Sequence, residues 1–518
     1  MRKNGMDTVS EQKNSRTTKE NAKKRQKHRN EKKAQKNPGS VRDRKPRQKD
    51  PKKSIYNIVY IFLGLFVLAM GYFAYFIVFR SNDVINSTYN KRQSVLAERV
   101  IRGRIQSADG EILAKTIVDK DGAETREYPY GEIFAPVVGR FARGRSGLED
   151  SENIRLLTSN INPIEKMYND LIGEKSPGDN VITTLDTRLQ QVAYNALKGY
   201  RGAVVVMEPK TGKILAMVSL PSYDPNKIEE QWETLVEDKD NKSPLLNRAT
   251  QGLYPPGSTF KLLTTLAYMR QNPSYDSYVY NCNGAIEEDG MVIHDHSSRG
   301  HGEVDLTRSL AKSCNTSYSN IGRSLDPDQF HALAEDFLFN KDLPVTMASS
   351  RSSFTLQKAN SSAKEAMQTA IGQGKTLITP LHNAMIVSTI ANGGAMMKPY
   401  VVDYVENAYG GVVKTYSPQL YSNPMTPQEA EYIGGMMRKV VTEGTATKLM
   451  NMKAEAAGKT GSADHGKGKA HSWFVGYAPY DNPEIAVSII VESVGTGSEY
   501  AVPIAREIFE AYFNSENK

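Results

Sequence analysis

Apolar and polar positions divide the chain into a polar start, a long apolar run and a mixed remainder. Residues 1–53 contain almost no apolar side chains, so this segment cannot bury a core and we predict a disordered tail. Ile55 to Phe79 then form 25 consecutive residues without a charge, which is long enough to cross a bilayer. This run is longer than the apolar core of a signal peptide, and no small-residue cleavage site follows it. We therefore predict a transmembrane helix over residues 54–80.

The segment 81–180 is polar, with short apolar runs between turn signals such as "SADGEILAKT" and "SPGDN". Asp-Gly and Pro-Gly favour tight turns between short strands. We predict that residues 81–180 form an irregular module that contains β-strands.

Residues 181–518 carry longer patterns, which alternate between the strand period and the helix period. "NVITTLDTRLQQVAYNALKGY" predicts a strand followed by a helix, whereas "GAVVVME" and "KILAMVSL" predict a pair of buried strands. Helical patterns dominate from Thr259 to about Arg323 and return in "TPLHNAMIVSTIANGG" and "PQEAEYIGGMMRKVVTEG". Strands return in "SWFVGYAP" and "EIAVSIIVES". This order predicts an α/β layered domain whose sheet joins distant parts of the chain.

The net charge of +8 is concentrated at the start of the chain. Residues 1–53 carry 20 Lys and Arg against 6 Asp and Glu, whereas the remainder carries 46 against 52 and is mildly acidic. Basic residues beside an apolar span stay on the cytoplasmic side, so we predict a cytoplasmic N-terminus and an extracytoplasmic domain after Arg80. The inner leaflet is anionic, so anionic lipids are the expected partner of the tail and no nucleic acid is expected.

Cysteine and histidine residues leave two questions open. Cys282 and Cys314 both lie on the exported side, where a disulfide is permitted, yet two free thiols fit the sequence equally well. The histidines of "HDHSSRGHGEV" (His294, His296 and His301) lie close together, as metal ligands often do, but a polar surface loop explains them as well. We predict the surface loop and no metal.

Three short motifs follow one another along the chain: Ser258-Thr-Phe-Lys261, Ser313-Cys-Asn315 and Lys459-Thr460-Gly461. A serine hydroxyl is a poor nucleophile and needs a base within hydrogen-bond reach. Lys261 lies one helical turn after Ser258 and can act as that base if burial or a neighbouring cation, such as Lys459, lowers its pKa.

The remaining motif residues have groups that suit substrate binding. Ser313 can relay a proton, and Asn315 can both donate to and accept from a substrate amide. Lys459 and Thr460 together suit a carboxylate, and backbone N–H groups near Gly461 can form half of an oxyanion hole.

Each motif is weak when taken alone. Ser-x-x-Lys also occurs at Ser309/Lys312 and at Ser361/Lys364, and Lys-Thr-Gly also occurs at residues 210–212. The latter copy follows a proline and joins two apolar runs, so a turn explains it. The ordered trio is the set found in penicillin-binding proteins and related β-lactamases, and it is much stronger than its parts.

The chain resembles a class B penicillin-binding protein, a membrane-anchored D,D-transpeptidase of peptidoglycan synthesis. Besides the motifs, "GAVVVMEPKTGKILAMVSLPSYDPN", "PLLNRATQGLYPPGSTFK", "HGEVDLTRSLAKSCN", "TAIGQGKTLITPLHNAMI" and "HSWFVGYAP" follow that domain in order, over about residues 181–515. "RGRIQSADGEILAKT" and "REYPYG" resemble the pedestal module of the family more loosely. The resemblance implies a central, mostly antiparallel sheet flanked by helices in residues 181–518, after a pedestal in residues 81–180.

The resemblance also implies a role for each motif residue. Ser258 would be the acylated nucleophile, Lys261 its base and Ser313 the proton shuttle. Asn315 would orient the donor stem peptide, and Lys459 and Thr460 would bind its terminal carboxylate. The oxyanion hole would be formed by backbone N–H groups of Ser258 and Ser462, beside Gly461.

The reaction implied is attack on a D-Ala-D-Ala bond, release of D-Ala and transfer of the acyl group to an amine of a neighbouring stem peptide. β-Lactams would acylate the same serine. No cofactor is implied, and a multi-span cell-wall glycosyltransferase is the expected protein partner.

Several other functions fit the sequence less well. Only about 100 residues separate the apolar run from the transpeptidase-like region, and they show no paired-glutamate signature of a glycosyltransferase domain. A β-lactamase needs an activator of the deacylating water, and a β-lactam sensor normally has several spans. A non-catalytic scaffold of a cell-wall complex remains the alternative from a different functional class. The sequence does not distinguish a role in division, elongation or sporulation.

Overall fold

The computed structural model describes residues 51–77, 92–359, 361–466 and 468–515, and it divides into two compact units, residues 1–81 and 82–518. In the first unit, helix α2 (Pro51–Tyr75) contains a stretch, Ile55–Tyr75, with a mean hydropathy of 2.1 and no buried residues. Its length and composition suit a membrane span, as expected from the apolar run. The predicted tail falls almost entirely on residues 1–50, which lie outside the described residues.

The second unit begins with a small α/β module. A six-stranded sheet has the order β15-β14-β6-β2-β3-β4. Three of these strands (β2, β3 and β4) come from the predicted pedestal, β6 lies at its predicted end, and β14 (Val402–Glu406) and β15 (Val412–Thr415) come from much later in the chain. Strand β14 pairs antiparallel with β6 (Asn180–Thr183), so this sheet joins segments on both sides of residue 180. The other elements are α4 (Arg92–Arg99), β1 (Val100–Ile101), β2 (Ile105–Gln106), β3 (Ile112–Val118), β4 (Glu124–Glu127), α5 (Ala135–Val138), α6 (Gly147–Ser151), α7 (Asn153–Leu156), α8 (Pro163–Ile172) and β5 (Ser176–Pro177).

A buried ion network holds this module together. Both oxygens of the fully buried Glu149 carboxylate are paired, one with Arg102 at 2.6 Å and one with Arg126 at 2.8 Å. Burial would raise the pKa of Glu149, but the two guanidinium groups outweigh it and hold that pKa below its usual range. The network ties helix α6 to strand β4 and to the chain before β2.

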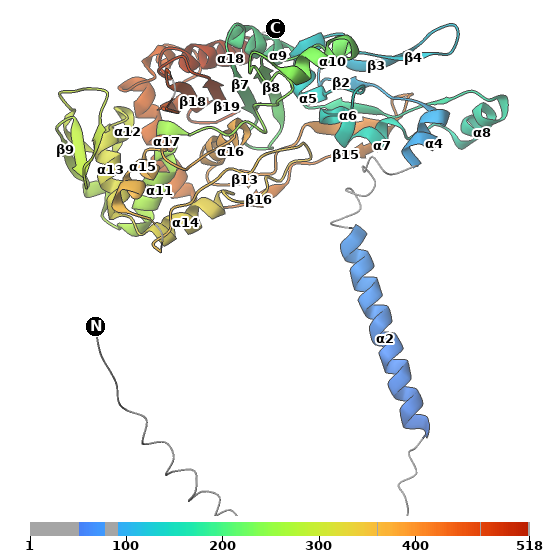
Figure 1. Cartoon of the computed structure of the whole chain (residues 1–518), viewed down its shortest axis with the longest axis horizontal. Coiled ribbons are helices and arrows are strands. Elements are labelled where there is room, and N and C mark those ends of the chain that lie inside the picture. Colours follow the sequence, from blue (N-terminus) through green and yellow to red (C-terminus); the bar gives the residue numbers. More distant parts are fainter. Residues whose placement is uncertain (1–50, 78–91, 360, 467, 516–518) are drawn as a thin grey trace, which may run out of the picture. The chain divides into compact units, whose positions relative to one another are not determined.

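The larger domain is organised around a five-stranded antiparallel sheet of order β17-β18-β19-β7-β8. Helices α9 (Thr187–Leu197) and α18 (Ala501–Ser515) pack on each other and on the sheet, whereas the fully buried middle of α16 (Pro380–Ala391) packs on β18, β19 and β7 (Figure 1). The strands are β7 (Gly202–Met207), β8 (Ile214–Leu220), β17 (Ala457–Ala463), β18 (His471–Ala478) and β19 (Ile485–Val491). The predicted strand pair, later strands and flanking helices are therefore present.

Further helices form a second layer beside β17. They are α11 (Lys261–Gln271), α12 (Leu306–Ala311), α13 (Asn315–Ser324), α14 (Pro327–Asp336), α15 (Ala363–Ala370) and α17 (Pro427–Thr442), and α17 packs on β17. The remaining regular elements are α10 (Ile228–Glu237), β13 (Met396–Met397) and β16 (Leu420–Ser422).

The prediction that helical structure dominates from Thr259 to Arg323 is wrong between α11 and α12. There the chain forms two hairpin-like pairs, β9 (Val279–Cys282) with β12 (Gly302–Asp305) and β10 (Ala285–Glu288) with β11 (Met291–His294). Asp289 and Gly290, both at positive φ, link β10 to β11. Asp-Gly is a strong signal for such a two-residue turn, and it overrides the local helical periodicity.

The ion network makes the pedestal sensitive to loss of a single charge. Glu149→Gln leaves two buried arginines without a counterion, so we expect the free energy of unfolding to fall by about 3–5 kcal/mol. Asp150→Asn is the matched control, because Asp150 forms a partly exposed pair with Arg145 that contributes at most about 1 kcal/mol. Urea unfolding of the full chain in detergent would measure both, and equal losses would contradict the role given to Glu149.

Candidate active site

Three parts of the chain, which we call corners, form the candidate site. The first corner is the turn that carries Ser258. The short helix η4 (Gly257–Thr259) follows two prolines and leads directly into α11. Gly257 donates its N–H to the carbonyl of Gly372 (2.9 Å), and a Cβ at Gly372 would lie 2.0 Å from the Gly257 oxygen. The Gly372-Gln373-Gly374 segment is thus a structural turn that packs against the turn of Ser258.

Lys261 is buried at the start of α11. Its ammonium Nζ donates to the Ser313 carbonyl (2.7 Å) and to Asn315 Oδ1 (2.9 Å), and it lies 3.5 Å from Ser313 Oγ. Burial lowers the pKa of Lys261 to about 8, although Cys314 and Asp295 act in the opposite direction. A base with a pKa near the working pH transfers protons efficiently, so Lys261 is suited to deprotonate a hydroxyl.

Lys459 approaches the same hydroxyl from strand β17. Its Nζ donates to Ser313 Oγ (2.9 Å) and to the Thr460 carbonyl (2.7 Å), and the side chain is fully buried. Burial, and then the charge of Lys261, lower the pKa of Lys459 well below its ordinary value. The Ser313 hydroxyl is therefore in contact with two lysines whose affinity for protons is reduced.

The Ser313-Cys-Asn315 segment joins the end of α12 to the first residue of α13. Ser313 has a φ of +56°, which is uncommon for a residue other than glycine but common at the end of a helix. Here the Ser313 N–H donates to the Leu310 carbonyl (3.0 Å) and the Cys314 N–H donates to the Ser309 carbonyl (2.9 Å), which ends α12. The Asn315 amide Nδ2 donates to the His294 carbonyl (3.0 Å), and the Asn315 backbone N–H donates to Asp295 Oδ1 (2.5 Å). Both contacts come from the chain around β11, which thus supports the segment from outside the helices.

The third corner is the edge strand β17. In the part of the chain that the structure describes, β17 pairs only with β18, so its other edge carries no strand. Gly461 allows β17 to lie close to η4, since a Cβ there would lie 3.0 Å from Trp473 Cβ and 3.1 Å from Thr259 Cγ2, which is tighter than side chains usually pack. Thr460 Oγ1 lies 2.5 Å from Thr445 Oγ1, and Ser462 Oγ accepts from the Gly497 N–H at 3.4 Å.

The structure therefore brings the three predicted motifs together. The contacts also involve residues to which the sequence analysis gave no place in the site: Asp295 and the His294 carbonyl behind Asn315, Thr445 beside Thr460, and Tyr318, whose ring lies 5.2 Å from the Lys261 ammonium. None of them stands in a sequence motif with recognisable spacing, so they can be assigned to the site only from their contacts in the structure.

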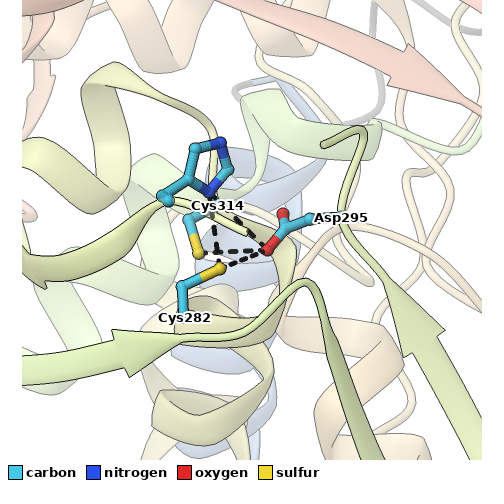
Figure 2. Close-up of side chains that lie close together, drawn as sticks. Cys282, Asp295 and Cys314 are labelled. Carbon is cyan, nitrogen blue, oxygen red and sulfur yellow. Dashed lines mark hydrogen bonds and ion pairs between the residues drawn. The ribbon is translucent and has the colours of Figure 1, made fainter. Parts of the chain in front are cut away.

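The residues left open by the sequence are also placed. Cys282 and Cys314 are free, buried thiols, so the structure has no disulfide between them (Figure 2). His294 and His296 are exposed, as predicted for a surface loop, but His301 differs: its Nδ1 lies 3.5 Å from Cys282 Sγ.

The second Lys-Thr-Gly copy forms the turn between β7 and β8, with Gly212 at positive φ.

Comparison with known proteins gives consistent matches. A model of the penicillin binding protein transpeptidase domain matches residues 202–510, and a model of the penicillin binding protein A dimerisation domain matches residues 102–181. The peptidoglycan D,D-transpeptidase PbpA of Mycolicibacterium smegmatis is 34% identical, over 81% of this chain and 91% of that protein.

Solved structures agree with these matches. The imipenem acyl-enzyme complex of penicillin-binding protein A from M. tuberculosis has a TM-score of 0.74 and 30% identity, covering 81% of this chain and 99% of that one. The D,D-transpeptidase domain of a peptidoglycan glycosyltransferase from Eggerthella lenta has a TM-score of 0.73 and 30% identity, with the same coverage.

The glycine turn behind Ser258 allows a direct test of the local geometry. Gly372→Ala adds a Cβ 2.0 Å from the Gly257 oxygen at a φ of +72°, so we expect a loss of stability of about 3 kcal/mol or more. Gly374→Ala is the matched control: its φ of +76° is similar, but the nearest atom is 3.6 Å away, and we expect about 1–2 kcal/mol. Thermal unfolding of both variants would measure the difference. Equal losses would show that strain at positive φ, and not the contact with Gly257, decides the effect.

Proposed function

Because this chain belongs to the penicillin-binding protein transpeptidase family, we propose that it is a peptidoglycan D,D-transpeptidase whose acyl-enzyme forms on Ser258. The resemblance and the fold class expected from the sequence are confirmed. The assignment of roles to these residues rests on one observation. The ammonium groups of Lys261 and Lys459 both contact the same hydroxyl, Ser313 Oγ, beside the turn that holds Ser258.

The first half of the reaction forms an ester. Ser258 Oγ attacks the carbonyl carbon of the D-Ala-D-Ala peptide bond while Lys261 accepts the hydroxyl proton. The negative charge that develops on the carbonyl oxygen is stabilised by the backbone N–H groups of Ser258 and Ser462. Ser313 Oγ then passes its proton to the departing nitrogen and takes a proton from the Lys261 ammonium, so that the C–N bond breaks, D-Ala leaves and Lys261 is neutral again.

The second half transfers the acyl group. The amine of a neighbouring stem peptide attacks the ester carbon and loses a proton to Lys261. Lys261 returns this proton to Ser258 Oγ as the ester bond breaks, which restores the free serine. A β-lactam follows the first half only, because ring opening leaves its amine tethered and no leaving group departs. Acylation by a β-lactam therefore reports on Ser258 and Lys261 without the acceptor.

Strand β17 is suited to hold the donor peptide. An extended peptide can pair with the free edge of a sheet through its main chain, which fixes the position of the bond to be cut. Lys459 and Thr460 would then hold the terminal carboxylate, and Asn315 the amide of the preceding residue. Gly461 keeps the strand close to η4, so that the bound peptide lies next to Ser258.

The membrane topology is part of the proposal. The basic residues before the apolar run place the N-terminus in the cytoplasm, with residues after Arg80 on the side where peptidoglycan is made. We infer a multi-span glycosyltransferase as partner from the need to cross-link newly made glycan strands, and anionic lipids as the ligands of the basic tail. The predicted boundaries, 54–80 for the span, 81–180 for the pedestal and 181–518 for the transpeptidase domain, stay predictions.

Labelled penicillin tests the nucleophile. We expect Ser258→Ala to abolish covalent labelling, because no other hydroxyl in the site has a lysine base at the same spacing. Ser361→Ala is the matched control, since it removes the serine of another Ser-x-x-Lys copy, and it should label like the wild type. Full labelling of the Ser258→Ala protein would refute the assignment.

Cells whose only copy of this protein is the Ser258→Ala variant would distinguish the enzyme hypothesis from the scaffold hypothesis. An enzyme predicts a marked fall in peptide cross-links, measured by chromatography of digested peptidoglycan. Normal cross-linking in these cells would favour the non-catalytic scaffold. The two buried lysines argue against the scaffold, because burying an ammonium group is unfavourable and a protein that only binds partners has no need of it.

The pH dependence of acylation tests the base. Lys261 must be neutral to accept a proton and its pKa is about 8, so the neutral fraction rises with pH. We expect the acylation rate constant with a labelled penicillin to increase about tenfold between about pH 7 and pH 9. Circular dichroism at the two pH values would control for unfolding. A rate that is flat or falls over this range would rule out Lys261 as the general base.

A further inference from the structure

The turn that follows helix α17, residues 443–445, is attached to two corners of the site. Helix α17 packs on both α12 and β17, and the turn begins where this helix ends. Lys312, directly before Ser313, donates from its Nζ to the Glu443 carbonyl (2.6 Å). A Cβ on Gly444 would lie 2.2 Å from the Ala311 carbonyl oxygen, so only a glycine lets the turn approach the end of α12 this closely.

The last residue of the 443–445 turn reaches the third corner. Thr445 Oγ1 lies 2.5 Å from Thr460 Oγ1, which is a short hydrogen bond between two hydroxyl groups. The chain after Thr445 is also fixed, because Ala446 is fully buried and its N–H donates to the Val440 carbonyl (3.0 Å). Thr445 is therefore held against strand β17 by the backbone on both sides of it.

Only one direction of this hydrogen bond is compatible with binding of a carboxylate. A threonine hydroxyl has one proton to donate, and it can accept from another donor at the same time. A carboxylate only accepts, so Thr460 has to give its single proton to the carboxylate that the proposed function assigns to it. The contact between the two threonines then requires Thr445 to be the donor. In the opposite direction, Thr460 would present only lone pairs to the carboxylate.

We propose that Thr445 is a positioning residue for the carboxylate subsite of the donor peptide. Its hydroxyl donates to Thr460 Oγ1 and so directs the Thr460 O–H toward the terminal carboxylate. Hydroxyl groups that donate in series polarise one another, which makes the Thr460 proton a better donor to an anion. This inference rests on the proposed function, since it concerns how the same site selects a donor that ends in a free carboxylate.

The placement of the turn also relates carboxylate binding to proton transfer. In the donor peptide the terminal carboxylate belongs to the D-Ala that leaves, and a single carbon separates it from the nitrogen that Ser313 protonates. The 443–445 turn contacts Thr460 on one side and the end of α12, directly before Ser313, on the other. Holding the carboxylate through Thr445 therefore fixes the departing nitrogen relative to its proton donor, which is the kind of alignment on which rates depend.

Acylation by a labelled penicillin and by its methyl ester tests the inference, because the ester lacks the charged carboxylate. Thr445→Val removes the hydroxyl and keeps the shape of the side chain. We expect this variant, as the full chain in detergent, to lower the second-order acylation rate constant of the acid about 3- to 10-fold, the effect of one hydrogen bond. The loss should appear as a higher half-saturating concentration. The ester should react with variant and wild type at rates within about twofold of each other.

Two further variants separate the hydroxyl group from the turn that carries it. Thr445→Ser keeps a hydroxyl at this position and should recover most of the rate with the acid. Thr442→Val is the matched control, because the Thr442 hydroxyl donates to the Arg438 carbonyl within α17 (3.4 Å), and it should react like the wild type with both compounds. Thermal unfolding would show which variants are folded, and Thr445→Ala gives the same comparison if Thr445→Val is unstable.

Three results would overturn the inference. One is an equal loss with the acid and the ester, which means that Thr445 only supports the turn. Another is a Thr445→Ser variant as slow as Thr445→Val. The third is an additive loss when Thr445→Val is combined with Thr460→Val, because a residue that acts through the Thr460 hydroxyl has no further effect once that group is gone. A wild-type chain that no penicillin labels would instead refute the proposed function itself, and the inference with it.

Discussion

The burial of two lysine ammonium groups around one serine hydroxyl is the constraint on which the rest of the active site depends. A buried ammonium is tolerated only when its donors are satisfied, and here the acceptors are the Ser313 carbonyl, Asn315 Oδ1 and the Thr460 carbonyl. The lysines come from helix α11 and strand β17, and their shared partner comes from the segment before α13. Folding therefore cannot bury Lys261 and Lys459 without also bringing the three motifs together.

Each corner is supported by a different kind of structure. Lys459 lies in a regular antiparallel strand, where the ladder with β18 fixes its direction. Ser258 lies in a turn held by a glycine contact, from Gly257 to Gly372, that leaves no room for a side chain. These two supports use only backbone hydrogen bonds and close packing, which makes them insensitive to the chemistry of the surroundings.

The sequence predicts the regular parts of this arrangement well and the irregular parts poorly. Long apolar runs predicted the strand pair β7 and β8, the later strands β18 and β19, and helix α16, since each is buried almost throughout. The pairing of β14 with β6 could not be predicted, because it joins residues more than 200 positions apart through two short strands, of which β14 is only partly buried. The meeting of Cys282, Asp295, His301 and Cys314 could not be predicted either, because these residues come from separate strands and loops; of the three histidines that stand close together in sequence, His301 takes part, whereas His294 and His296 are exposed.

The Ser313 corner is fixed from two sides. Its φ of +56° costs roughly 1–3 kcal/mol and must be maintained by the surroundings. One support is the end of helix α12: the Ser313 N–H donates to the Leu310 carbonyl (3.0 Å) and the Cys314 N–H to the Ser309 carbonyl (2.9 Å), which is the pattern that ends a helix with a residue at positive φ. The other support is Asp295, whose carboxylate accepts from the Asn315 N–H (2.5 Å) and from Cys314 Sγ (3.3 Å). None of these contacts uses the ammonium groups of Lys261 and Lys459, so the groups proposed to move protons are separate from those that hold the segment in place.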